Sequence, residues 1–126
     1  MSVPVTLEAL REQVRRFGTT TYLLTVADDG RPHSVAVSVA WDGDDLIMKC
    51  GRRTLSNVAA RPLVSLLWPP VETGGYSLIV DGDAAVRDQG GEARAVVRPT
   101  RAVMHRPSPS TPRPDAECAD DCVRLR

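Results

Sequence analysis

The sequence predicts a mainly β protein, a small closed antiparallel barrel of six strands with two short helices. Six segments are rich in β-branched residues or alternate between apolar and polar residues. Short turns built on glycine, proline and aspartate separate most of these segments. The 126 residues include only two Trp, two Tyr and one Phe. Small side chains suit the interior of a narrow barrel, and closing the barrel removes exposed strand edges.

The first expected element is an amphipathic helix that starts after Thr6. The Thr6 hydroxyl can cap the helix, and Gly18 ends it. Apolar residues recur between them at helical spacing, at Leu7, Leu10, Val14 and Phe17. We therefore expect one face of this helix to pack on the barrel.

Three strands are expected next, over residues 19–27, 33–41 and 45–50. The first is rich in Thr, Leu and Val, and the second alternates valines with small residues. The turns between them read Asp28-Asp29-Gly30-Arg31-Pro32 and Asp42-Gly43-Asp44. Such short connections predict antiparallel neighbours.

A short helix follows, with Leu55, Val58 and Ala59 on one face, and Arg61-Pro62 ends it. Three more strands are expected over residues 63–68, 76–87 and 93–104. Gly82 is a predicted bulge or bend, and Pro99 is predicted to interrupt the last strand.

The chain is predicted to form one domain over residues 1–106, followed by a mobile tail over residues 107–126. The tail begins PSPSTPRP, and four prolines in eight residues exclude a regular helix. Cys118 and Cys122 lie in this tail, and the pattern assigns them no role.

Composition excludes several classes of protein. The formal net charge is zero, unlike the broad basic surface of a nucleic-acid binder. No secretion signal or membrane-length apolar run is present. The three cysteines do not form a disulfide framework. We expect a soluble cytoplasmic protein with reduced thiols.

The segment from Lys49 to Asn57 is the clearest candidate ligand site. A strand ends at Cys50-Gly51, and a helix begins at Arg52-Arg53-Thr54. A helix start carries unpaired N–H groups and partial positive charge. Two guanidiniums and a hydroxyl beside it favour a phosphate-binding site. The alternative is a solvated turn in which Thr54 caps the helix.

Three stretches together resemble one known family: residues 25–37, which include Asp29-Gly30-Arg31-Pro32-His33, residues 51–57, and Arg61-Pro62-Leu63-Val64-Ser65-Leu66. This ordered series is similar to the pyridoxamine 5′-phosphate oxidase-like split-barrel flavoproteins, over roughly residues 6–105. The similarity is greatest to small members that bind FMN or the deazaflavin F420. It implies an FMN-binding split barrel of Greek-key type and a homodimer whose flavin sites are shared between both chains.

The resemblance also implies roles for individual residues. Arg52 and Arg53 would bind the cofactor phosphate together with Thr54, which stands where the family commonly has a phosphate-binding lysine. Arg and Lys bind phosphate with different geometry, so FMN, F420 and no cofactor all stay open. The other candidate cofactor-binding residues are Ser38, Lys49, Cys50, Gly51, Asn57 and, from the partner chain, Trp68.

Two of these residues have structural alternatives, since Trp68 could pack in the core and Cys50 could be a small buried filler. We find no catalytic triad, P-loop or metal-ligand set, and the catalytic residues stay unknown. The implied function is an FMN-dependent oxidoreductase whose substrate and electron donor the sequence does not name. One alternative is an F420-dependent reductase. The other is a non-catalytic barrel that binds flavin or haem as a carrier or sensor, or that has lost its cofactor.

Overall fold

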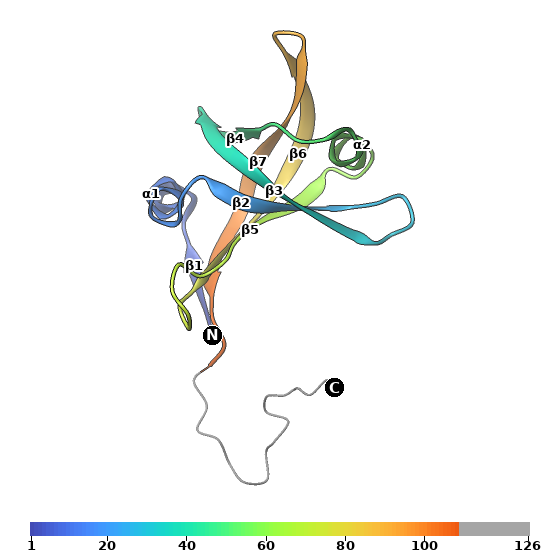
Figure 1. Ribbon diagram of the computed structural model, residues 1–126. Helices are drawn as coiled ribbons and strands as arrows, with labels where there is room; N and C mark the ends of the chain where they lie inside the picture. Colours follow the sequence, from blue (N-terminus) through green and yellow to red (C-terminus); the bar gives the residue numbers. More distant parts are fainter. Residues whose placement is uncertain (109–126) are drawn as a thin grey trace.

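The computed structural model describes residues 1–108. The predictions about most of the tail, including Cys118 and Cys122, therefore lie outside the described residues. Figure 1 shows the elements along the chain, which are β1 (Ser2–Val5), α1 (Leu7–Phe17), β2 (Thr20–Val26), β3 (Pro32–Asp42), β4 (Asp45–Met48), α2 (Arg52–Ala60), β5 (Leu63–Trp68), β6 (Ser77–Gln89) and β7 (Glu92–His105).

The sheet closes into a barrel. Its strand order is β1-β7-β4-β3-β2-β5-β6, and β6 also pairs with β7, which closes the six strands β2–β7 into a ring and leaves β1 as an extra strand beside β7. Every pairing is antiparallel. The predicted six-stranded antiparallel barrel with two helices is therefore confirmed.

Strand β1 is an addition to the predicted set. It runs beside the end of β7, with Ser2 opposite His105. Four residues that include Pro4 carry too little periodicity to predict a strand, and proline is tolerated there because β1 pairs on one side only. The two longest strands, β6 and β7, also extend past the predicted limits, to Gln89 and His105.

The β6–β7 hairpin contains a bulge beside Gly82. Asp81 faces Arg101 while Gly82 faces Pro99, so Thr100 is the extra residue. A Cβ at Gly82 would lie 2.6 Å from the nearest side-chain atom of β7, so this close approach requires glycine. The predicted bend at Gly82 is confirmed. Pro99 does not interrupt β7, because it lies next to the bulge.

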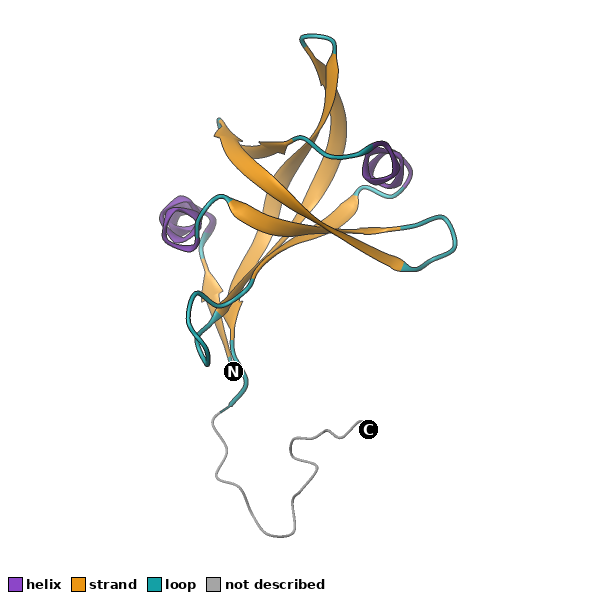
Figure 2. Cartoon of the chain, in the orientation of Figure 1, coloured by secondary structure: helices purple, strands orange, loops and turns teal. Residues whose placement is uncertain are grey.

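The core fills the barrel with the inward-facing residues of the strands, and the two helices lie on opposite sides of it (Figure 2). Helix α1 buries Leu10 and Val14, and its predicted Thr6 cap is present, with the Ala9 amide donating to Thr6 Oγ1 at 3.1 Å. Helix α2 buries Val58. Within residues 1–108, no helix is long and apolar enough to cross a membrane.

Candidate functional site

Helix α2 begins without a side-chain cap. Gly51 is its N-cap residue, and the first helical bond runs from the Leu55 amide to the Gly51 carbonyl at 3.0 Å. The amides of the first turn are thus open to a ligand. Gly51 has an ordinary φ of −73°, and a Cβ there would meet nothing within 4 Å. Neither backbone strain nor a neighbour within the chain requires glycine at this position.

A hollow of about 740 Å³ lies between this helix start and the β2–β3 turn. We call it the α2 hollow, and it is lined by Ala27, Asp28, Asp29, Arg52, Arg53, Ser56 and Asn57. It brings together the turn and the helix start, which the sequence separates by more than twenty residues. The predicted pair Arg52 and Arg53 forms part of its helix wall.

The charges in the α2 hollow are unequally paired. Asp28 is held by Arg61, with Nη2 2.6 Å from Oδ1. Asp29 lies 3.7 Å from the Arg31 guanidinium and also accepts the Arg31 amide. Among the described residues, Arg52 and Arg53 have no ion pair. Both carboxylates of the hollow are therefore partly neutralised by cations outside it, while its own two guanidiniums stay available to an anion.

Two of the predicted site residues are buried against the strands, although Asn57 also lines the α2 hollow. Thr54 is 2% exposed, and its Oγ1 lies 3.2 Å from His33 Nε2. Asn57 is 3% exposed, and its Nδ2 donates to Thr25 Oγ1 at 3.1 Å. These pairs fix α2 against β3 and β2. The Thr54 hydroxyl is thus engaged with His33. The sequence does not predict that His33 and Thr25 contact α2, because a strand pattern does not show which helix the strand will pack against.

Ser38 and Lys49 lie on the outer face of the barrel, in a second, smaller hollow of about 410 Å³ between β3 and β4. We call it the β3–β4 hollow. Lys49 is engaged there, since its Nζ lies 2.9 Å from Glu92 Oε2. The hydrogen bond from Lys49 lowers the pKa of Glu92. Cys50 and Gly51 connect Lys49 of this hollow to Arg52 of the α2 hollow.

Cys50 is half-buried and packs against the core. Burial raises the pKa of its thiol above the usual value, against a smaller opposing effect from a backbone hydrogen bond with Ala95. A raised pKa keeps the sulfur protonated at neutral pH, and a protonated thiol is a poor nucleophile. The environment of Cys50 is that of a packing residue.

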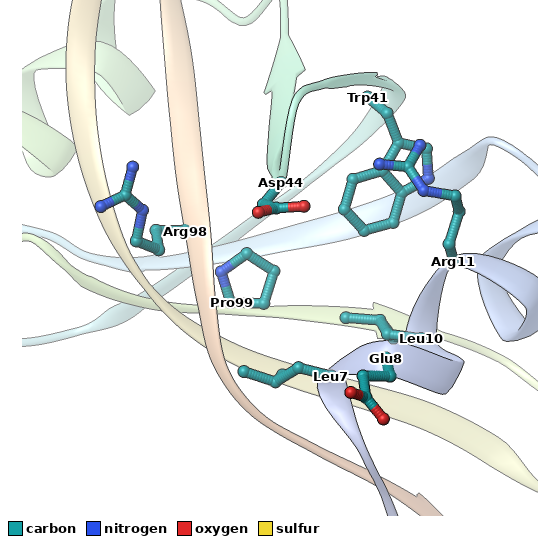
Figure 3. Close-up of a pocket in the computed structure, with 8 residues that line it drawn as sticks. All are labelled: Leu7, Glu8, Leu10, Arg11, Trp41, Asp44, Arg98 and Pro99. Atoms are coloured by element: carbon teal, nitrogen blue, oxygen red, sulfur yellow. The ribbon is translucent and has the colours of Figure 1, made fainter.

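A third hollow, of about 600 Å³, lies between α1, the β3–β4 hairpin and β7 (Figure 3). The Arg11 guanidinium lies over the Trp41 ring, 4.4 Å from its centroid, and donates to the Gly43 carbonyl. Arg98 pairs with Asp45 at 3.0 Å. Both cations are therefore engaged.

The third hollow also contains Glu8 and Asp44, which have no ion pair among the described residues. Anions are disfavoured there, in contrast to the α2 hollow. Over residues 1–108, no group of three His, Cys, Asp or Glu side chains could hold a metal ion.

The family model described as pyridoxamine 5′-phosphate oxidase matches residues 7–117. The chain belongs to this family. An uncharacterised protein of Mycobacterium bovis is 42% identical, over 81% of this chain and 82% of the relative.

Solved structures with the same fold come from this family and from cofactor-binding proteins. A structure described as a pyridoxamine 5′-phosphate oxidase of Listeria innocua has a TM-score of 0.64 and 18% identity, over 79% of this chain and 98% of that one. An F420 reductase has a TM-score of 0.57 and 22% identity, over 67% and 88%. An FAD-binding protein of Mycobacterium smegmatis has a TM-score of 0.63 and 12% identity, over 82% and 97%.

In this member of the pyridoxamine 5′-phosphate oxidase family, Trp68 lies in the core of its own chain. It is 1% exposed, and its indole Nε1 donates to the Gly18 carbonyl at 2.7 Å. This position matches the core-packing alternative, because a side chain so enclosed presents no surface to a second chain. We therefore leave Trp68 out of the proposed site.

Proposed function

We propose that this protein is an FMN-dependent oxidoreductase whose cofactor phosphate binds in the α2 hollow. One observation carries the proposal. Two guanidiniums without ion pairs, those of Arg52 and Arg53, lie beside the uncapped start of α2 in a hollow whose carboxylates are paired elsewhere. Open amides, the positive end of the helix and the two guanidiniums all favour a phosphate.

The flavin ring would supply the hydride chemistry once bound, while the protein binds and orients it. The segment from Lys49 to Gly51 is proposed to run beside the cofactor. The open space around Gly51 supports this, because a ligand can approach the backbone where no Cβ intervenes. Ser38 offers an exposed hydroxyl in the β3–β4 hollow.

F420 is the second candidate cofactor. The F420 reductase with the same fold supports it, and the open α2 hollow would also accept the phosphate of its longer tail. Arg52 and Arg53 would bind the phosphate of either cofactor. The choice between FMN and F420 therefore depends on contacts with the ring and with the tail beyond the phosphate.

The proposed assembly is a homodimer, and one face of the barrel supports it. The outward residues of β2, β3 and β5 adjoin one another, with Tyr22 opposite both Ala36 and Leu67. This face carries no charged side chain from Thr20 to Val26, from Pro32 to Ala40 or from Leu63 to Leu67. Tyr22 is 44% exposed and Leu63 is 73% exposed. A charge-free face with an exposed tyrosine and leucine is typical of a surface that another chain covers.

The dimer is tested by light scattering at micromolar concentration. A dimeric mass is expected for the wild type, and Ala36→Lys should shift it toward the monomer because a charge would be buried at the interface. A monomeric wild type would contradict the assembly.

The cofactor is tested by titrating cofactor-stripped protein with FMN, F420 and haem, followed by fluorescence or absorbance. Arg52→Ala/Arg53→Ala should weaken FMN binding by about 100-fold or more, because each hydrogen bond to a charged group contributes about 1.5–3 kcal/mol. Arg15→Ala/Arg16→Ala on α1 removes the same charge from a distant site and serves as the matched control. Equal affinity in the wild type and the Arg52/Arg53 variant would contradict the phosphate site.

A second experiment separates an enzyme from a carrier. The FMN-loaded protein is mixed with NADH or NADPH, and bleaching of the flavin absorbance is followed. Oxidation of NADH or NADPH that continues past one equivalent of flavin when an electron acceptor is added indicates turnover, whereas a bound flavin that neither nucleotide reduces excludes both as its electron donor.

A further inference from the structure

We propose that Arg61 is a positioning residue that keeps the α2 hollow selective for phosphate by neutralising Asp28. This inference rests on the proposed function and extends it to a residue that does not line the hollow. It starts from a contradiction in the hollow's composition. Its lining contains two carboxylates and two guanidiniums, a composition that by itself would favour internal ion pairs over an anionic ligand.

Arg61 does not line the hollow but forms an ion pair with one of these carboxylates, Asp28. It ends α2, where its amide bonds the Asn57 carbonyl at 2.8 Å. Its side chain then reaches the end of β2. Nε donates to the Val26 carbonyl at 2.7 Å, and Nη2 donates to Asp28 Oδ1 at 2.6 Å. Two bonds from one planar guanidinium fix both its position and its direction.

The Asp28–Arg61 ion pair changes the electrostatic charge that a phosphate encounters in the α2 hollow. Asp28 lines the α2 hollow, so without a cation its charge would act on the space where the phosphate is proposed to bind, reduced by the water around its exposed side chain. Repulsion between like charges would then weaken phosphate binding, and Asp28 could compete for Arg52 and Arg53. With Arg61 in place, Arg52 and Arg53 stay available.

Asp29 has a weaker partner. Its carboxylate lies 3.7 Å from the Arg31 guanidinium, compared with 2.6 Å between Asp28 and Arg61, and the Arg31 side chain is 85% exposed whereas that of Arg61 is 34% exposed. A longer ion pair to an exposed guanidinium offsets less of the carboxylate charge. Arg31→Gln should therefore change phosphate binding less than Arg61→Gln does, although both remove one cation beside the same hollow.

The experiment is a double-mutant cycle on the full chain, with FMN as the probe and riboflavin, which is FMN without its phosphate, as the comparison. Arg61→Gln should weaken FMN binding three- to tenfold at low salt and leave riboflavin binding within twofold. In an Asp28→Asn background, the same Arg61→Gln change should alter FMN affinity less than twofold, because no carboxylate charge is left to neutralise. High salt should reduce the effect of Arg61→Gln.

A purely structural role for Arg61 gives a different pattern. If Arg61 only tethers β2 to α2 through Val26, Arg61→Gln weakens binding equally in both backgrounds and affects riboflavin as much as FMN, and the proposal is wrong. Arg61→Lys is the second variant, used if Arg61→Gln does not fold. It keeps the cation, so an affinity for FMN within threefold of the wild type is expected, and a tenfold loss would overturn the proposal.

The two proposals fail separately. If Arg52→Ala/Arg53→Ala binds FMN like the wild type, the phosphate site itself is wrong. If that variant loses binding while Arg61→Gln keeps it, only the role of Arg61 is wrong. A wild type that binds neither FMN nor F420 overturns both.

Discussion

Asn57 donates a hydrogen bond from Nδ2 to the Thr25 hydroxyl oxygen at 3.1 Å, and both side chains are buried. The bond joins the middle of α2 to β2. With His33 and Thr54 at the first turn and Arg61 at the last, it fixes α2 to the β2–β3 hairpin at three levels. The two walls of the α2 hollow are therefore held by contacts behind the site.

The first prediction concerns this buried pair. Asn57→Leu should lower the free energy of unfolding by about 1–3 kcal/mol, because it leaves the Thr25 hydroxyl buried without its partner. Denaturant unfolding measures the loss. Ser56→Ala, at an exposed neighbouring position, should stay within about 0.5 kcal/mol of the wild type. Adding Thr25→Val to Asn57→Leu should recover part of the loss, and no recovery would show that packing outweighs the hydrogen bond.

The second prediction concerns Trp68. Trp68→Phe removes the donor to the Gly18 carbonyl and should cost about 1–3 kcal/mol of stability, whereas Trp68→Ala should cost about 3–5 kcal/mol. Thermal or denaturant unfolding measures both. FMN affinity of the folded Trp68→Phe variant should stay within about twofold of the wild type. A selective loss of FMN binding at unchanged stability would return Trp68 to the cofactor site.

The third prediction compares Gly82, which is closely packed, with Gly51, which is not. Gly82→Ala should lower stability by about 1–3 kcal/mol, because its Cβ would lie 2.6 Å from Val97 Cγ1 and 2.7 Å from the Arg98 carbonyl. Gly51→Ala meets nothing within 4 Å and should change stability by only a few tenths of a kcal/mol. If the cofactor approaches this backbone, Gly51→Ala should weaken FMN binding instead. Equal stability of the two variants would contradict the close packing at the bulge.

The fourth prediction concerns Cys50. Because burial raises the pKa of its thiol, less thiolate is present at pH 8 than for a free cysteine, and iodoacetamide should react more slowly. The rate should rise as pH increases through the raised pKa, since the thiolate is the reacting form. The measurement uses a Cys118→Ser/Cys122→Ser background so that one thiol reports. Alkylation as fast as that of free cysteine would contradict the buried environment.

Local patterns were sufficient for most of the elements. Period-two alternation and tight turns predicted the barrel strands, and the Thr6 cap and Gly18 bounded α1 where they were expected. These features act between residues close in the chain, so sequence carries them. The sequence does not predict strand β1, because its four residues form a strand only by pairing with β7. The prediction that Pro99 interrupts β7 is wrong, because Pro99 lies at a bulge that depends on Gly82 across the hairpin.

In the candidate site too, some features follow from the local sequence and others only from the tertiary structure. Sequence alone determined that a helix starts after Gly51 and that Arg52 and Arg53 stand at its positive end, since spacing and residue type are local properties. Tertiary structure decided which groups face that end. It paired Thr54 and Asn57 with His33 and Thr25, enclosed Trp68 in the core, and placed Asp28 in the same hollow as Arg52, with Arg61 paired to Asp28. Closure of the barrel brings these distant segments together, and pairing between charges depends on distances that no linear pattern contains.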